Sequence, residues 1–310
     1  MTHEHRGLSL ALATILLLGL LPFRASLARD VLPVPEQGFG GNVGRTFKDS
    51  DPPVFPQSPR PAKDAPNIVV VILDDVGFGQ FESFGGGVPS PTLQQLAAEG
   101  LRFNRFHTAG ICSPTRAALL TGRNPHRAGF GNVSELSTGY DGYTGSLPRS
   151  TATVAEILRL NGYATAMFGK NHNTPAWEAG PAGPFNHWPT GFGFEYFYGF
   201  NGWGTSQWEP VLAENTRTIA LDRRPGYHLT TDLDDRAIGW ARTIKANDPT
   251  QPFFLYFATG ATHSPHHAPP EWIAKFKGKF DTGWDAYREQ TFARQQQLGV
   301  IPADARLTPR

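Results

Sequence analysis

The residues that could do chemistry begin with Cys112, the only cysteine among 310 residues. Ser113 is a good N-cap and Pro114 suits the first helical position, so a helix is predicted to start there and to close at Gly122. The start of a helix attracts anions, because its first N–H groups lack partners and its dipole is positive there. Arg116 follows one turn after the cysteine, and its planar guanidinium suits a tetrahedral oxyanion. The alternative interpretation is that the cysteine is a small buried hydrophobic residue.

Two adjacent carboxylates, Asp74 and Asp75, follow the apolar run at residues 67–73. A turn after a strand is the ordinary interpretation of such a pair. Neighbouring carboxylates repel each other, however, and a hard divalent cation relieves the repulsion by taking oxygen ligands. The pair is therefore a candidate metal site.

Lys170 and His172 follow the strand predicted at residues 163–168. A lysine supplies a point charge for an anion, and a histidine can hold a hydroxyl or transfer a proton. The alternative is a solvated loop end without a chemical role.

His263 follows the strand predicted at residues 253–257, and His266 and His267 come shortly after it. A zinc site made of these three histidines is one alternative, but neighbouring prolines restrict the loop and no cysteine or acid completes the set. We therefore take His263 as the candidate site residue and the other two histidines as rim or surface residues.

The elements that must position these residues alternate between strands and helices. The run at residues 67–73 is continuously apolar and β-branched, as expected of a parallel strand buried on both faces. The pattern predicts an α/β fold with a largely parallel or mixed sheet sandwiched by helices. Ligands bind at the carboxyl edge of such sheets, where the candidate residues would meet around Cys112. The predicted strands lie at residues 67–73, 101–106, 163–168 and 253–257, and the predicted helices begin at residues 91 and 154, span 233–244 and span 284–298.

The segment from Cys112 to Arg123 reads Cys-x-Pro-x-Arg, then a short Ala/Leu helix, then Thr-Gly-Arg, and it resembles the signature of the sulfatase family. The resemblance implies an alkaline-phosphatase-like fold and hydrolysis of sulfate esters of the arylsulfatase type, with a small-molecule or glycan sulfate ester as substrate. It also implies oxidation of the cysteine to formylglycine by a formylglycine-generating enzyme. The alternatives are a phosphonate monoester or phosphodiester hydrolase of the same superfamily, and an inactive, truncated relative.

The resemblance assigns a role to each residue that matches the family pattern. Asp74 and Asp75 match the pair that binds Ca²⁺ or Mg²⁺, with the formylglycine from Cys112 as a further metal ligand. Arg116 matches the arginine that holds the formylglycine. In the implied mechanism one hydroxyl of the hydrated aldehyde attacks sulfur, and loss of a proton from the second expels sulfate.

The remaining catalytic roles implied by the resemblance fall on Lys170, His172 and His263. The lysine and the later histidine contact the sulfate group, and the histidine of Gly-Lys-x-His holds a hydroxyl or passes a proton. Asn171 stands where a tryptophan is frequent in the family, which affects packing on the substrate side rather than the charges. The aromatic residues at 185–208 are expected in the core, with the lining of a pocket for an aromatic leaving group as the alternative.

Residues 1–28 have the features of a signal peptide, with an apolar run at 8–23 followed by the small residues Ser26 and Ala28. The run is short for a stable membrane span, so export to the periplasm or the extracellular space is predicted. Residues 29–66 read as an N-terminal arm rich in proline and glycine, and residues 67–310 as the N-terminal portion of a catalytic domain. The net charge of +1, without a basic stripe, argues against a nucleic-acid partner.

The end of the chain differs from the family pattern. Sulfatases also hold the metal with a later Asp-Asn pair, and no Asp-Asn dipeptide occurs in these 310 residues. We therefore expect the resemblance to cover only the N-terminal half to two-thirds of a sulfatase catalytic domain. The expected consequences are an exposed sheet edge, weak metal binding, a tendency to aggregate and little turnover.

Overall fold

The structure is a computed structural model that describes residues 38–55, 58–220 and 224–309. The chain divides into two compact units, residues 1–57 and 58–310. In the first unit, a short 3-10 helix, η2 (Phe47–Asp49), is described. The predicted signal peptide at residues 1–28 lies outside the described residues, and the predicted domain boundaries stay predictions.

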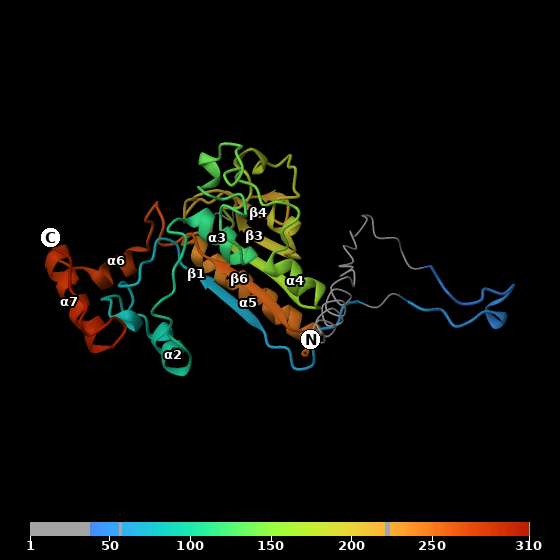
Figure 1. Cartoon of the computed structure of the whole chain (residues 1–310), viewed down its shortest axis with the longest axis horizontal. Coiled ribbons are helices and arrows are strands. Elements are labelled where there is room, and N and C mark those ends of the chain that lie inside the picture. Colours follow the sequence, from blue (N-terminus) through green and yellow to red (C-terminus); the bar gives the residue numbers. More distant parts are fainter. Residues whose placement is uncertain (1–37, 56–57, 221–223, 310) are drawn as a thin grey trace, which may run out of the picture. The chain divides into compact units, whose positions relative to one another are not determined.

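A six-stranded sheet lies at the centre of the second unit, with the strand order β1-β6-β2-β3-β4-β5 (Figure 1). The first four strands of this order are parallel, whereas β4 runs antiparallel to β3 and β5 antiparallel to β4. This arrangement confirms the predicted α/β class with a largely parallel, mixed sheet. The strands are β1 (Ile68–Ile72), β2 (Ala164–Lys170), β3 (Tyr196–Phe200), β4 (Leu212–Glu214), β5 (Arg217–Ile219) and β6 (Phe253–Ala258).

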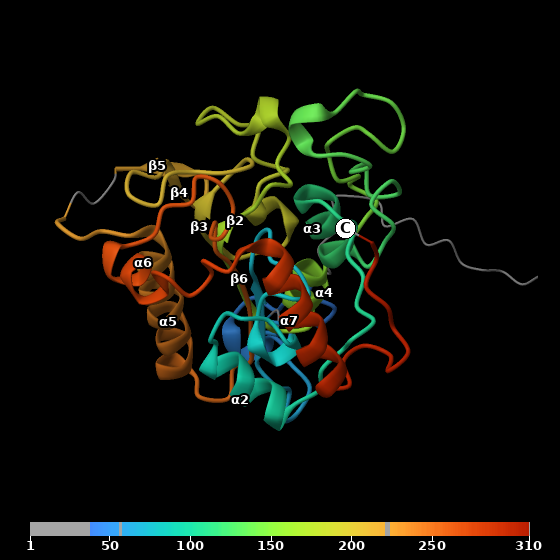
Figure 2. The same cartoon turned by 90° about the vertical axis from the view of Figure 1, so that its left-hand side faces the viewer.

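Helices cover both faces of the sheet. Figure 2 shows α5 (Leu229–Asn247) on one side, with α3 (Cys112–Thr121) and α4 (Val154–Leu160) on the other. The amphipathic helix α5 (Leu229–Asn247) packs Leu233 into a core cluster with Phe168 and Leu255. On the opposite face, Leu120 of α3 and Ala155 of α4 join a second cluster with other residues of the strands. Burying each large apolar side chain contributes roughly 1.5–3 kcal/mol, so these two layers hold the strands in register.

The remaining helices lie beyond the carboxyl end of β1, where α2, α6 and α7 are seen in Figure 1. Among the residues that the structure describes, no helix is both long enough and apolar enough to cross a membrane. The helices are α2 (Pro91–Glu99), α3 (Cys112–Thr121), α4 (Val154–Leu160), α5 (Leu229–Asn247), α6 (Pro270–Phe276) and α7 (Gly283–Gln297), and the further 3-10 helices are η3 (Glu82–Phe84), η4 (Ser134–Leu136), η5 (Ala176–Glu178) and η6 (Pro189–Phe192).

Two predictions about strands are wrong. Residues 101–106 form no strand. Leu101 and Phe103 are 83% and 65% exposed, so the alternating apolar residues of this segment do not form a buried face of a sheet. The strand β1 exists as predicted but is not buried on both faces, because Val69 and Val71 are 56% and 58% exposed. It is the edge strand of the sheet, and α5 packs on β2, β3 and β6 instead.

Other differences arise where the sequence signal is weak. Strand β3 lies inside the aromatic-rich segment, which has no clean period to separate a strand from a packed loop. The hairpin of β4 and β5 has three residues in each strand, too few for a periodic pattern. Helix α6 is not predicted from the sequence, because the lysines in and after it make this segment look like a polar loop.

Candidate active site

The helix that carries the candidate nucleophile begins two residues earlier than predicted. Helix α3 starts at Cys112 itself, with Ile111 as its N-cap, and Ser113 lies inside the first turn rather than capping it. Gly122 ends the helix in the left-handed conformation, as predicted, and its N–H donates to the carbonyl of Ala118. Cys112 is a free, half-buried cysteine, and its side chain makes no hydrogen bond with the described residues.

Asp74 is the buried centre of a charge cluster built from three segments far apart in the sequence. It is 5% exposed, and the Lys170 ammonium lies 2.5 Å from its Oδ2. The Arg116 Nη2 lies 3.5 Å from its Oδ1. Burial works to raise the pKa of Asp74, but the charges of Arg116 and Lys170 and the hydrogen bond from Lys170 outweigh it and hold this pKa below its usual value.

The loops after β1 and β6 hold Asp74 in place through its backbone. The N–H and the hydroxyl of Thr262 both donate to the Asp74 carbonyl, at 3.1 and 2.8 Å, and the Asp74 N–H donates to the Ala261 carbonyl at 3.3 Å. Because β1 and β6 are parallel neighbours, their carboxyl ends meet at one edge, as the sequence predicted.

Arg116 is the least satisfied polar side chain of the cluster. It is 1% exposed, and its Nη1 donates to the Lys170 carbonyl at 2.8 Å. Its Nε and Nη2 make no hydrogen bond with the described residues, although Nη2 remains in ionic contact with Asp74. A buried guanidinium with two unbonded nitrogens can still bind an oxygen-rich group.

Asp75 and His263 form a looser pair beside this buried cluster. The Asp75 side chain is 61% exposed, and its Oδ2 lies 3.9 Å from His263 Nε2. Asp75 adopts a φ of 57°, a left-handed conformation that is uncommon for residues other than glycine and that is concentrated at functional sites. The ring of His263 packs against Trp203, with 5.4 Å between the ring centroids, and Trp203 is 52% exposed.

His172 is fully buried and also left-handed, with a φ of 55°. Its Nε2 lies 2.8 Å from Oε2 of Glu135, whereas its Nδ1 has no hydrogen-bond partner among the described residues. Burial and the charges of Lys170 and Arg116 lower the pKa of His172, against the opposing effect of Glu135. Imidazole is therefore the favoured form of this side chain near neutral pH.

Two residues of the site were missed from the sequence. Asn173 donates from Nδ2 to the Ser113 carbonyl at 3.0 Å, and a second asparagine directly after Lys-Asn-His was its available signal. Glu135 lies on η4, and no spacing in the sequence connects it with His172. Asn171 turns to Thr174 and Asn201, at 2.7 and 2.8 Å from its Nδ2.

The fit to a divalent cation is limited to the two carboxylates. Asp74 and Asp75 offer the hard oxygen donors that Ca²⁺ and Mg²⁺ take. In the part of the chain that the structure describes, no group of three or more histidine, cysteine or acidic side chains gathers where it could hold a metal. The three-histidine zinc alternative is therefore unsupported for His263, His266 and His267.

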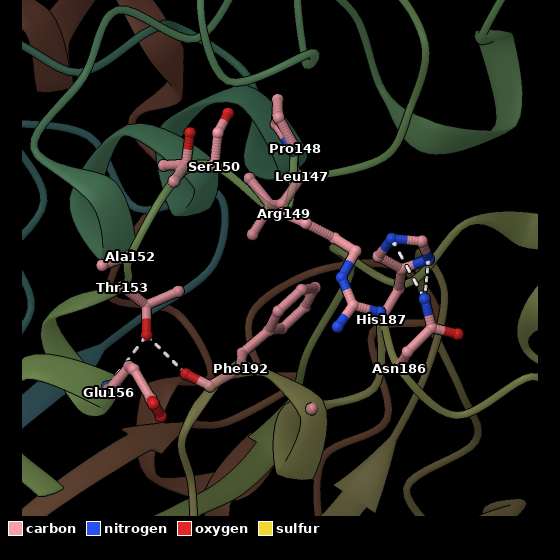
Figure 3. A pocket seen from close by; sticks show the side chains of 12 residues that line it. Leu147, Pro148, Arg149, Ser150, Ala152, Thr153, Glu156, Asn186, His187 and Phe192 are labelled. Carbon is pink, nitrogen blue, oxygen red and sulfur yellow. Dashed lines mark hydrogen bonds between the residues drawn. The ribbon is translucent and has the colours of Figure 1, made fainter. Parts of the chain in front are cut away.

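A pocket of about 510 Å³ lies apart from these residues, on the loops around η6 and the start of α4. None of the predicted site residues lines it. Arg149 extends across it toward Asn186 and His187 (Figure 3). The buried charged side chains of the candidate site, Asp74, Arg116 and Lys170, lie instead at the carboxyl edge of the sheet.

Comparison with known proteins identifies the family of this chain. The family model described as Sulfatase matches residues 66–302. An arylsulfatase of Klebsiella aerogenes is 33% identical over 256 residues, covering 79% of this chain and 53% of the relative. Arylsulfatase A of Bos taurus is 34% identical over 228 residues, covering 66% of this chain and 42% of the relative.

The fold gives the same result. The crystal structure of Ps i-CgsB superposes with a TM-score of 0.58 at 26% identity, covering 76% of this chain and 53% of that chain. The chain therefore belongs to the sulfatase family and has the α/β fold of its members. It spans about half the length of the curated relatives that it matches.

Proposed function

We propose that this chain carries the active site of a sulfate ester hydrolase of the arylsulfatase type, with Cys112 matured to formylglycine. The observation that carries the proposal is the Arg116 guanidinium, which is buried beside Lys170 and has two nitrogens that make no hydrogen bond within the described part of the chain. One carboxylate, Asp74, faces these two cations, so the buried cluster keeps a formal excess of positive charge. Such a cluster suits an anionic, tetrahedral group such as a sulfate ester.

Each predicted catalytic residue has a role that its surroundings support. Lys170 and Arg116 would stabilise charge on the sulfuryl oxygens, where buried charges act more strongly than in water. His263, whose side chain is 16% exposed, would contact the sulfate from the solvent side. His172, whose Nδ1 has no partner among the residues that the structure describes, would exchange a proton with the group at position 112.

The start of α3 gives position 112 a suitable electrostatic setting. The first N–H groups of this ten-residue helix point toward the site, and together with Arg116 they favour negative charge on a reacting oxygen. An aldehyde hydrate at position 112 would supply one hydroxyl as nucleophile to sulfur and a second hydroxyl whose deprotonation releases sulfate. A formylglycine-generating enzyme is the maturation partner that this proposal requires.

Asp74 and Asp75, with an oxygen of the formylglycine formed from Cys112, would hold Ca²⁺ or Mg²⁺. A divalent cation there would supply further positive charge for the sulfuryl group. Asp74 is kept ionised by its neighbours, and Asp75 is exposed enough for a cation to reach it, so both side chains could act as oxygen ligands. Other ligands would have to come from water or from outside the described residues.

The substrate class that we propose is an aryl or glycan sulfate ester. Among the relatives, one is named N-acetylgalactosamine-6-sulfatase of Mus musculus, at 32% identity over 253 residues. A structure of Ps i-CgsB, at 26% identity, is described in complex with k-i-k-neocarrahexaose. The half-exposed Trp203 next to His263 offers an apolar surface on which an aryl or sugar ring could stack. Export to the periplasm or the extracellular space is the matching proposal for its location.

The relatives named here are sulfatases, so phosphonate or phosphodiester hydrolysis is not favoured. The test compares protein coexpressed with a formylglycine-generating enzyme, unconverted protein and Cys112→Ala, each with 4-nitrophenyl sulfate and bis(4-nitrophenyl) phosphate. Peptide mass spectrometry and hydrazide labelling report conversion at position 112. We expect the converted protein to release sulfate and nitrophenol faster than both controls. Equal rates in all three samples, or a clear preference for the phosphodiester, would contradict the proposal.

A further inference from the structure

The carboxylate of Glu135 is the one described hydrogen-bond partner of the buried imidazole of His172. The two groups meet at 2.8 Å through His172 Nε2 and Glu135 Oε2. The histidine is 0% exposed, and the Glu135 side chain is 31% exposed. The other ring nitrogen, Nδ1, has no hydrogen-bond partner among the described residues. A buried nitrogen without a partner is costly, so the missing partner of Nδ1 calls for a reason.

The chain neighbours of Glu135 and His172 both donate hydrogen bonds to Ser113, the residue that follows Cys112. The Ser134 N–H donates to Oγ of Ser113 at 3.4 Å, on the Glu135 side of the contact. On the other side, Asn173 donates to the Ser113 carbonyl at 3.0 Å. Hydrogen bonds therefore connect η4, the loop after β2 and the first turn of α3 pairwise.

The protonation states of this pair follow from the contacts. Burial works against charge on Glu135, but the hydrogen bond and the charge of His172 outweigh it and lower the pKa of Glu135 to about 2. The Ser134 hydroxyl also donates to Glu135 Oε2, at 3.0 Å. An ionised carboxylate only accepts hydrogen bonds, so the shared proton belongs to His172 Nε2. In the neutral ring, Nδ1 then carries the lone pair.

We propose that Glu135 is a positioning residue that fixes His172 as the Nε2–H tautomer and leaves its Nδ1 lone pair facing the site. This inference rests on the proposed function for its purpose, because a proton from the hydroxyl at position 112 would pass to Nδ1. The imidazolium formed by that transfer would then be stabilised by the Glu135 carboxylate. Lys170 and Arg116, which disfavour the same imidazolium, make this compensation necessary.

The test is the tautomer itself, read from ¹⁵N chemical shifts of the histidine rings in the full chain at neutral pH. A ring nitrogen that carries a proton and one that carries a lone pair differ widely in shift. His172→Gln assigns the signals. For wild type we expect a proton on Nε2 and a lone pair on Nδ1 of His172. Glu135→Leu, which removes the acceptor, should convert this single tautomer into a mixture.

A matched control lies elsewhere in the chain. His187 is paired with Glu178 at 2.7 Å through Nδ1, away from the site. Glu178→Leu should change the signals of His187 and leave those of His172 as they are, and Glu135→Leu should do the reverse. Unchanged His172 shifts in folded Glu135→Leu, or an Nδ1–H tautomer in wild type, would overturn the proposal.

Glu135→Gln keeps the proposal testable if Glu135→Leu does not fold. The amide retains an oxygen acceptor but loses the charge, so the Nε2–H tautomer should persist while the titration midpoint of His172 falls. A midpoint equal to that of wild type would show that the carboxylate has only a structural role. These readouts need neither maturation of Cys112 nor turnover, so their failure can be told apart from failure of the proposed hydrolysis.

Discussion

The charges at the strand ends are arranged so that each buried group has a partner of opposite sign. An isolated buried carboxylate costs several kcal/mol, and Asp74 avoids this cost through Lys170 and Arg116. The residue types and their places after strands were readable from the sequence. Their pairing was not, because the buried contacts depend on how the loops close, and Glu135 has no sequence signal at all.

The exposed carboxylate provides a clean test of metal binding. Asp75→Asn removes one charge and leaves the buried contacts of Asp74 intact, so the fold should be unaffected. We expect the affinity for Ca²⁺ or Mg²⁺, measured by calorimetry, to fall by roughly tenfold or more, since even outer-shell changes cost that much. Asp141→Asn, another exposed aspartate, is the control. Identical titrations for wild type and Asp75→Asn would remove Asp75 from the ligand set.

Glu135 should also affect stability in acid. Its pKa in the folded protein, about 2, is below its ordinary value of 4.5, so it contributes stability above pH 4.5 that is lost as the pH falls toward 2. Glu135→Gln cannot titrate, so its free energy of unfolding should decline less than that of wild type between pH 5 and pH 3. Urea unfolding at each pH measures the difference, with Glu99→Gln as control. Parallel curves for wild type and Glu135→Gln would refute this prediction.

At the scale of elements, alternation of strands and helices was the most reliable sequence signal. The bounds of α2, β2, α5 and β6 agree with the predictions to within a few residues, because long apolar stripes and caps mark them. The start of α4 has one half of a capping box. The Glu156 N–H donates to the Thr153 hydroxyl at 3.1 Å, but the Glu156 carboxylate pairs with Arg159. Residues 101–106 and the short hairpin show where local pattern is too weak to decide.

Thr153 is expected to contribute to the stability of the fold, because its hydroxyl connects two elements. It accepts from the N–H of Glu156 and donates to the Phe192 carbonyl of η6 (Figure 3). Thr153→Ala should lower the free energy of unfolding by about 1–2 kcal/mol, the usual cost of losing an N-cap threonine. Thr243→Ala, on the exposed side of α5, should change it by less than about 0.5 kcal/mol. Equal effects of the two substitutions in chemical unfolding would contradict the assigned cap.

At the scale of the molecule, the sheet is well covered on β2, β3 and β6 and poorly covered on β1. Val69 and Val71 point to the same face of the edge strand and stay more than half exposed. The sequence favoured a fully buried strand because a continuous apolar run does not reveal which strand lies at an edge. An exposed apolar edge is a template for pairing with another chain.

Val71→Lys should therefore reduce self-association of the protein without unfolding it. A lysine at this half-exposed position keeps its charge in water and disfavours edge-to-edge pairing. Sedimentation velocity over a range of concentrations measures the effect, and Leu160→Lys, at an exposed position of α4, is the matched control. Association that is weakened equally by both lysines would indicate a general charge effect rather than a role of β1.

The central claim, that residue 112 receives the sulfuryl group, is tested most directly by mass spectrometry of Cys112→Ser after incubation with 4-nitrophenyl sulfate. A serine at this position has a single hydroxyl, so it can accept a sulfate group but cannot expel it. We predict a stable gain of one sulfate group on the peptide at position 112, accompanied by at most one equivalent of nitrophenol. Sulfate on a different residue, or repeated turnover by Cys112→Ser, would contradict the account.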